Sequence, residues 1–398
     1  MSKSQSSFST DPSAQSSADS TATRREFLQL AGAAVFTAGA APAILGAEDK
    51  AGTKSVVIGE GDFRYECHHG WGQLPSKIQW RNTHGVTVDK DGFVYIKHQG
   101  RPKTDVDTIV VFDPDGKYVR SFGSEYAGGG HGIDIRYEEG TPFLYLSDTF
   151  NQQVVKCDLN GEWVWRTRYP REPHLYEKLG QFRPTNVCFG PNGDLYVGDG
   201  YGSSYIHQYN QHGGWVRSWG GKGEQPGKMS TPHGQWLDDR PGREPMLVIA
   251  DRANSRLQYF TLDGKPVSCL QGVLCTKDNA DPTEADLAKK MEKYGNFAAE
   301  PQLALSFPAD VDIQGEYMLV PDLHARVLIF DGGNKLVANL GHDAAWTQNV
   351  LGMKVRTDPG QWVDGKFVHP HDACFDKDGN IFVTEWVDAG RVTFLKRV

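Results

Sequence analysis

Three histidines that lie far apart in the sequence could together bind a transition metal. Each follows a Gly or Pro at the start of an apolar stretch, in Gly130-His131-Gly132, Pro232-His233-Gly234 and Pro370-His371-Asp372. The intervals are 102 and 138 residues, so short metal-binding motifs would not detect them. Neutral imidazole is a ligand of zinc and also of iron, copper and nickel. The three side chains can share one ion only if a repeating fold brings equivalent positions together.

A repeat of four strands occupies the chain from about residue 56. Its unit is a short apolar strand, an Asp/Asn-Gly turn, a strand ending in Asp, a third strand, and a closing strand that often ends in Trp-Gly or Phe-Gly. The clearest copy spans residues 184–220, and other copies begin near Thr83, Gly130, Pro232, Pro308 and Pro370. Six such units predict an all-β, six-bladed β-propeller.

The two ends of the repeat region complete each other. The last copy stops at Val398, one strand short, whereas residues 63–72 resemble a fourth strand without a blade. Pairing them would close the ring and remove the exposed edges of an open array. We therefore expect an N-terminal strand to complete the last blade.

The innermost strands of a propeller line its central channel, so equivalent residues form a ring. Aligning the six strand starts places these residues at one level: His84, His131, Thr185, His233, Ala309 and His371. The histidines of blades two, four and six would converge from directions about 120° apart and leave a coordination position open, as in catalytic zinc sites. We assign His84 to supporting a ligand or contacting substrate. The alternative is that each histidine only hydrogen-bonds the neighbouring blade.

Residues just beyond the second strand of a blade should reach the same mouth of the channel. Asp199-Gly200-Tyr201 and Asp251-Arg252 occupy such turns in blades three and four. Tyr201 could act as a base or proton shuttle, and Arg252 could hold a carboxylate with two hydrogen bonds. The alternatives are turn packing and, for Arg252, a surface ion pair.

The segment Asp251–Phe260, with weaker copies at 148–155 and 322–329, resembles NHL repeats, and the resemblance covers residues 56–398. Residues 276–306 interrupt the repeat between blades four and five. There, Asp281-Pro282-Thr283-Glu284 could cap a helix. We expect a partly helical insertion, either a solvated decoration or a lid.

The channel motifs carry a more specific resemblance, together with Asp107–Pro114, Val197–Tyr201 and Ile249–Asn254. The chain resembles the peptidyl-α-hydroxyglycine α-amidating lyases, zinc propellers that split a C-terminal α-hydroxyglycine into a peptide amide and glyoxylate. The resemblance implies zinc on His131, His233 and His371, with Tyr201 and Arg252 in catalysis. It also implies a structural calcium on the Asp372 carboxylate and the carbonyls of Val86 and Ile133.

Two positions depart from that family. Gln99 stands where the family has a second active-site arginine, for which Arg101 could substitute, and His369 stands where the family has a methionine. We expect Gln99 and His369, like His84, to contact substrate or to support the residues that do. The expected function is a zinc-dependent carbon–nitrogen lyase acting on a small molecule or a peptide C-terminus. The alternatives are a calcium-dependent lactonase-like or streptogramin-lyase-like propeller enzyme, and a non-catalytic NHL scaffold that binds a protein or glycan.

The first 47 residues are expected to be a disordered tail and an export signal. Thr23-Arg24-Arg25-Glu26-Phe27-Leu28 precedes a soft, Ala/Gly-rich apolar segment, which resembles a twin-arginine signal. An amphipathic N-terminal helix is the alternative. The mature chain is expected to be a periplasmic or extracellular monomer with no membrane-spanning segment.

Overall composition excludes several classes of protein. With 50 acidic and 42 basic side chains, a net charge of -8 gives no electrostatic basis for nucleic-acid binding. No apolar run is long enough for a multi-span membrane protein. None of the six cysteines forms a Cys-x-x-Cys pair, and we predict no disulfide.

Overall fold

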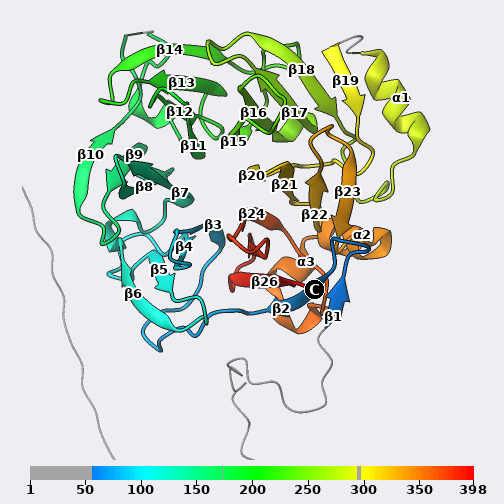
Figure 1. The fold of residues 1–398 in the computed structure, drawn as a ribbon, viewed down its shortest axis with the longest axis horizontal. Coiled ribbons are helices and arrows are strands. Elements are labelled where there is room, and N and C mark those ends of the chain that lie inside the picture. Colours follow the sequence, from blue (N-terminus) through cyan, green and yellow to red (C-terminus); the bar gives the residue numbers. More distant parts are fainter. Residues whose placement is uncertain (1–55, 173, 294–296) are drawn as a thin grey trace, which may run out of the picture. The chain divides into compact units, whose positions relative to one another are not determined.

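The computed structural model describes residues 56–172, 174–293 and 297–398, and these form a ring of six blades around a central axis (Figure 1). The predicted all-β, six-bladed propeller is confirmed. The predicted tail and export signal, residues 1–47, lie outside the described residues. Within the described part, no helix combines the length and apolar character needed to cross a membrane.

The first three blades are four-stranded antiparallel sheets. Blade one contains β3 (Thr83–Val88), β4 (Val94–His98), β5 (Ile109–Phe112) and β6 (Tyr118–Phe122). Blade two contains β7 (Gly130–Glu138), β8 (Thr141–Asp148), β9 (Gln153–Cys157) and β10 (Trp163–Thr167). Blade three contains β11 (Asn186–Phe189), β12 (Leu195–Gly198), β13 (Tyr205–Tyr209) and β14 (Trp215–Gly220).

Blade four has five strands and blade five has four. Blade four contains β15 (Pro232–Asp238), β16 (Met246–Asp251), β17 (Arg256–Phe260) and β18 (Pro266–Gln271), and β19 (Ala298–Pro301) pairs with β18 in parallel. Blade five contains β20 (Asp312–Gln314), β21 (Tyr317–Asp322), β22 (Arg326–Phe330) and β23 (Leu336–Leu340).

Blade six joins the two ends of the described chain. It contains β24 (Pro370–Phe375), β25 (Ile381–Glu385) and β26 (Arg391–Arg397), followed by β2 (Tyr65–His69) and β1 (Val56–Ile58). β2 runs antiparallel to β26, with Tyr65 opposite Arg397 and His69 opposite Thr393. The predicted closure is confirmed, and β1 adds a fifth strand that the repeat pattern did not indicate.

Apolar side chains pack between neighbouring blades. Both faces of a blade meet another blade, so strands such as β5 and β22 are buried along their whole length. One cluster joins Leu319 and Ile329 of blade five to Ala373 and Val383 of blade six, each at most 1% exposed. This packing fixes the inner strands and therefore the residues that line the channel.

Two helical segments interrupt the ring. The first contains α1 (Glu284–Glu292). Thr283 caps the start of this helix, because its hydroxyl accepts from the Asp286 N–H and its own N–H donates to the Asp286 carboxylate. The second lies between blades five and six and contains α2 (Ala344–Leu351), α3 (Lys354–Thr357) and the 3₁₀ turn η5 (Pro359–Gln361). Our sequence analysis did not predict this second segment. The six cysteines, all within the described residues, are free.

Candidate functional site

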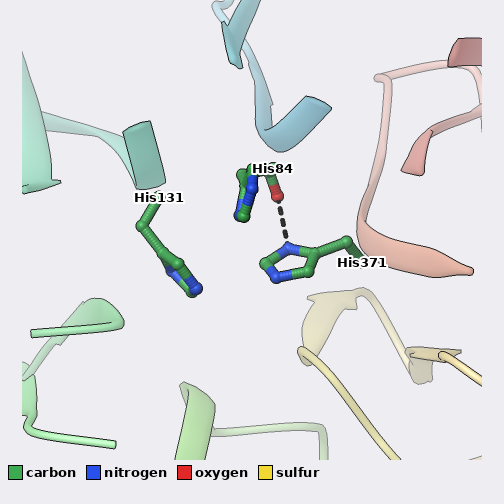
Figure 2. A group of neighbouring side chains, drawn as sticks. All are labelled: His84, His131 and His371. Carbon is green, nitrogen blue, oxygen red and sulfur yellow. Dashed lines mark hydrogen bonds between the residues drawn. The ribbon is translucent and has the colours of Figure 1, made fainter. Parts of the chain in front are cut away.

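Four histidines surround one point of the channel. His84, His131, His233 and His371 are each the second residue of an innermost strand, β3, β7, β15 and β24 respectively. Their exposed fractions are between 2% and 6%. Figure 2 shows His84, His131 and His371 projecting from three blades toward one another. The register of the repeat therefore converts positions distant in sequence into neighbours.

The distances between the rings are short enough for a shared ion. The ring centroids of His131, His233 and His371 are 4.6–4.8 Å apart. The ring of His84 lies 4.4 Å from that of His371 and 5.1 Å from that of His131. Ligand nitrogens of His84, His131 and His371 all lie within 4.8 Å of one another.

Three of the rings are oriented by the next blade. The Nδ1 atoms of His131, His233 and His371 donate to carbonyls at the equivalent position of the following blade, those of Thr185, Ala309 and His84 respectively. Figure 2 marks the bond from His371 to His84. A proton on Nδ1 leaves the Nε2 lone pair free to bind a metal, and backbone carbonyls often orient metal-binding histidines in this way.

Hydrogen bonding to the next blade does not account for the whole cluster. Among the described residues, the Nε2 atoms of His131 and His371 have no hydrogen-bond partner, and neither nitrogen of His84 has one. Buried polar atoms without partners are costly, about 1–3 kcal/mol each. A metal ion would satisfy these nitrogens. His84, which sequence analysis assigns to supporting a ligand or contacting substrate, has a ring nitrogen within 4.8 Å of those of His131 and His371.

Burial keeps the imidazoles neutral. It is the main cause that lowers the pKa values of His84, His131 and His233 well below the usual range, and it lowers the pKa of His371 to about 3, with Arg252 adding to the effect. Metal binding requires the neutral form, so these side chains need lose no proton to bind an ion. The cluster could hold a metal ion.

Tyr201 and Arg252 lie beside this cluster. The Tyr201 hydroxyl is 2.9 Å from His233 Nε2, and Arg252 donates to the same hydroxyl over 3.3 Å. The guanidinium of Arg252 lies 5.2 Å from the ring centroids of both Tyr201 and Phe307. Tyr201 is 39% exposed, whereas Arg252 is 9% exposed. A phenol that reaches solvent, a cation and the histidines therefore meet at one mouth.

Buried carboxylates hold the turns that carry these two residues. Asp199 accepts from the backbone N–H groups of Arg183 and Ser203. The Arg183 carbonyl in turn accepts from the Tyr201 N–H. Asp251 accepts from Arg256 at 2.7 Å and from Asn254 at 2.8 Å. The charged positions of the repeat motif thus fix the turns before any ligand is present.

The other predicted site residues lie on the side of blades one and six. Gln99 accepts a hydrogen bond from Asn82, whereas Arg101 lies exposed on the loop after β4. His369 is 3% exposed and donates from Nδ1 to Leu323, and its Nε2 has no partner in the described chain. Sequence analysis missed Arg356, which lies on α3 beside Asn82. The interval between Leu340 and Pro370 is longer than a turn between blades requires, and this length could have indicated an insertion that contributes residues to the site.

A second group of acids, three buried and one half-buried, lies farther along the channel. Asp134, Asp310, Asp312 and Asp372 line a cavity of about 190 Å³ together with Val86. Burial raises the pKa values of all four, to about 6 for Asp312 and about 8 for Asp310. Asp372 accepts a hydrogen bond from the Val86 N–H. Ile133, also predicted as a calcium ligand, is buried on β7.

Glycines make room for this acidic group. A Cβ atom at Gly234 would lie 1.8 Å from the Asp310 carboxylate, and one at Gly132 would lie 2.3 Å from the Asn186 side chain. The position after the channel residue is glycine in blades one, two and four and a polar residue in blades three, five and six. This distribution was readable from the sequence and could have identified Asp310.

The fold and the histidine cluster define the class of protein: a six-bladed propeller whose channel could hold a metal ion. A protein of unknown function from Bacteroides thetaiotaomicron VPI-5482 has the same fold, with a TM-score of 0.51 and 14% identity over 86% of this chain and 77% of that one. No protein-family model matches the chain.

Sequence comparison relates this propeller to α-amidating proteins. It is 31% identical to peptidylglycine alpha-amidating monooxygenase of Rattus norvegicus over 180 residues, 44% of this chain and 18% of that protein. It is 24% identical to the probable peptidyl-alpha-hydroxyglycine alpha-amidating lyase pgal-1 of Caenorhabditis elegans over 156 residues, 39% of this chain and 43% of that one. The match thus spans less than half the length of either relative.

Proposed function

We propose that the chain is a metal-dependent carbon–nitrogen lyase that cleaves an α-hydroxyglycine-type substrate into an amide and glyoxylate. The observation that carries the proposal is the histidine cluster, in which the Nε2 atoms of His131 and His371 have no partner in the described chain and His233 Nε2 contacts Tyr201, to which Arg252 donates. The name of the nematode relative supplies the reaction class. The substrate is a small molecule or the C-terminus of a peptide.

In this proposal, His131, His233 and His371 hold zinc through Nε2. Bound zinc would polarise an oxygen of the substrate as a Lewis acid. The Nδ1 hydrogen bonds to the next blade keep each ring in the tautomer that zinc requires. His84 faces the same point and either contacts the substrate or acts as a further ligand.

Tyr201 is the proposed base. Its deprotonated oxygen takes the proton of the substrate hydroxyl, the carbon–oxygen double bond of glyoxylate forms and the carbon–nitrogen bond breaks. The amide nitrogen then takes this proton from Tyr201, which returns the base to its starting state. Arg252 donates to the Tyr201 oxygen and would stabilise its phenolate form. The exposed fraction of Tyr201, 39%, gives substrate access to this oxygen.

Arg252 is the proposed partner of the substrate carboxylate. Its Nε has no hydrogen-bond partner among the described residues, and its guanidinium is held between two aromatic rings. An arginine with a fixed plane and free donors suits a carboxylate. Holding this group would place the adjacent carbon beside the metal and Tyr201.

His233 Nε2 cannot accept the Tyr201 proton and bind a metal at the same time. Metal loading would therefore release the Tyr201 hydroxyl from the contact at 2.9 Å. The Tyr201 oxygen would then be available to the substrate. Metal binding and activation of the base are coupled in this arrangement.

We further propose that calcium occupies the acidic cavity as a structural ion, held by Asp372 and neighbouring oxygens. Four carboxylates around one cavity, three of them buried, repel one another unless they are protonated or paired with a cation, and calcium prefers oxygen ligands. Removing calcium with a chelator should lower the melting temperature, and adding calcium should restore it. A melting temperature that does not change on chelation would contradict the proposed calcium site.

The reaction is tested with peptides that end in α-hydroxyglycine. We expect the zinc-loaded protein to release glyoxylate in equal amount to the peptide amide, and His233→Ala to abolish release. Absence of glyoxylate release from the folded, zinc-loaded protein would refute the proposed reaction. The non-catalytic scaffold would then be the better account.

The cellular location is a separate proposal. We propose that residues 1–47 direct export and that the mature chain works as a monomer in the periplasm or outside the cell. Replacing Arg24 and Arg25 with lysine should retain the protein in the cytoplasm, as cell fractionation would show. Unchanged export of this variant would contradict the twin-arginine signal.

A further inference from the structure

Arg356 lies beside the ends of channel strands of blades one and six, although it comes from outside the repeat. It is part of α3, in the helical segment between blades five and six. Its Nε donates to the Trp386 carbonyl over 3.1 Å, and its Nη2 donates to the Asn82 side chain over 2.8 Å. Trp386 directly follows β25, as Arg252 directly follows β16, and Asn82 lies two residues before His84. Both contacts therefore place the guanidinium at the channel mouth.

A chain of hydrogen bonds joins Arg356 to Gln99. The amide of Asn82 accepts from Arg356 and donates to the Gln99 side chain over 2.7 Å. Gln99 directly follows β4, so it occupies in blade one the position that Arg252 occupies in blade four. This position carries no positive charge in the present chain, and Arg356 supplies one two hydrogen bonds away.

The guanidinium of Arg356 is held in one orientation with donors to spare. Its central carbon lies 3.8 Å from the centroid of the Trp386 ring, and stacking on tryptophan fixes the plane of an arginine. Its described partners are Trp386, Asn82 and the carboxylate of Asp388. These take three of the five N–H donors of an arginine. Two donors remain for a ligand.

We propose that Arg356 binds the substrate carboxylate, or a second anionic group of the same substrate, from the side opposite Arg252. The inference rests on the proposed function, because it assigns a residue to that reaction. It explains how the channel can lack an arginine at position 99 and still offer two cations to an anionic substrate. Arg356 would then position the substrate, while Tyr201 carries out the proton transfer.

The charges around Arg356 permit this role. Asp388 forms an ion pair with it over 2.6 Å, but the Asp388 side chain is 44% exposed, so solvent screens the pair. His369 lies nearby, with its ring centroid 5.6 Å from that of Trp386, and it donates from Nδ1 to the Leu323 carbonyl. Glu385 is occupied by Arg391 in an ion pair. A carboxylate at the mouth meets no unpaired acid from these neighbours.

The test compares Arg356 with Arg101, the other candidate for the missing cation. The variants are Arg356→Gln, Arg101→Gln and the double change Gln99→Arg with Arg356→Gln. The exposed Arg217 of β14 provides the matched control, Arg217→Gln. Each zinc-loaded protein is titrated with glycolate, a hydroxy acid that lacks the cleavable nitrogen, and is assayed for KM and kcat with an α-hydroxyglycine peptide.

We expect Arg356→Gln to raise the Kd for glycolate and the KM by about 30-fold, the loss typical of a charge-assisted hydrogen bond. Zinc content and melting temperature should stay at the wild-type level.

Arg101→Gln and Arg217→Gln should change both constants less than about twofold. The double variant should recover about tenfold, because an arginine at position 99 restores the lost charge. Arg356→Lys, which keeps the charge without the planar fork, should fall between wild type and Arg356→Gln, and it replaces Arg356→Gln if that variant does not fold.

Glycolate binding that is unchanged in Arg356→Gln, or lost in Arg101→Gln instead, would overturn the inference. Failure of wild type to bind glycolate would overturn it as well. If glycolate binding depends on Arg356 but wild type releases no glyoxylate, the proposed reaction fails while the assignment of Arg356 stands. The two hypotheses are therefore tested separately.

Discussion

At the residue scale, the central feature is a difference between the two nitrogens of each channel histidine. Nδ1 of His131, His233 and His371 is satisfied by a backbone carbonyl, whereas Nε2 faces the other histidines or Tyr201. A purely structural histidine would be expected to satisfy both atoms. The Nε2 atoms of His131 and His371, which have no partner in the described chain, are therefore better explained by a metal site than by packing between blades.

Replacing Tyr201 with phenylalanine should lower kcat for glyoxylate release by about 10²–10⁴-fold, because the base is lost. Zinc content should be unchanged, since the proposed ligands remain. Tyr118→Phe removes a hydroxyl that contacts Ser121 on β6 and is the matched control. A Tyr201→Phe variant as active as Tyr118→Phe would refute the role of Tyr201 as base.

Asp199 should make stability depend on pH. Burial raises its pKa from 3.8 to about 6, although backbone N–H groups oppose the effect. Because the folded state holds the proton more tightly, the contribution of Asp199 is largest below pH 3.8 and is lost as pH rises through about 6.

The expected readout is the unfolding free energy of wild type relative to Asp199→Asn. Between about pH 4 and pH 7 this difference should shift against wild type by at most about 3 kcal/mol. Denaturant titrations at several pH values would measure it. A constant difference across this range would show that the Asp199 pKa is not raised.

At the scale of elements, buried ion pairs connect blades at positions the repeat motif does not describe. Arg240 pairs with Asp238, and both side chains are fully buried. Arg240 also donates to the Asp331 carbonyl and the Asn334 side chain of blade five, over 2.7 and 2.6 Å. This arginine thus links the end of β15 to the turn between β22 and β23.

Asp238→Ala should lower the unfolding free energy by about 3–5 kcal/mol, because it leaves a buried guanidinium without its carboxylate. The control is Asp263→Ala, which breaks an exposed pair with Lys265 and should cost less than about 1 kcal/mol. Denaturant unfolding measures both variants. Equal effects of the two substitutions would show that burial does not govern the contribution of these pairs.

The elements also show what could and could not be predicted from the sequence. The six copies of one repeat unit predicted the blades and the closure of the ring. They also predicted that the histidines share one level, because residues at equivalent positions of the inner strands lie at the same depth in the channel. Arg356 could not be found in this way, since α3 is four residues long and lies outside the repeat. The closeness of His84 to the predicted ligands depends on how far the blades tilt, and a sequence alignment carries no such information.

At the scale of the whole molecule, closure of the ring holds the site together. β2 covers β26, and Tyr65 and Cys67 of β2 pack into the cluster between blades five and six at 1% and 8% exposure. Channel residues from blades one and six, including His84 and His371, meet across this closure. Opening the ring should therefore affect the metal site as well as stability.

Deletion of residues up to 69 should lower the melting temperature by more than about 10 °C, since several kcal/mol of apolar burial are lost and a strand edge is exposed. Calorimetry would measure it. Deletion of residues 1–47 is the control and should leave the melting temperature unchanged. A melting temperature that is the same for both truncations would contradict closure through β2.

The most direct test of the account is the metal content of the purified mature protein, produced without affinity histidines and measured by mass spectrometry. We expect about one zinc ion per chain in wild type, lost in both His131→Ala and His233→Ala and retained in Arg217→Gln. A folded wild-type protein with no transition metal, even after incubation with zinc, would contradict the account.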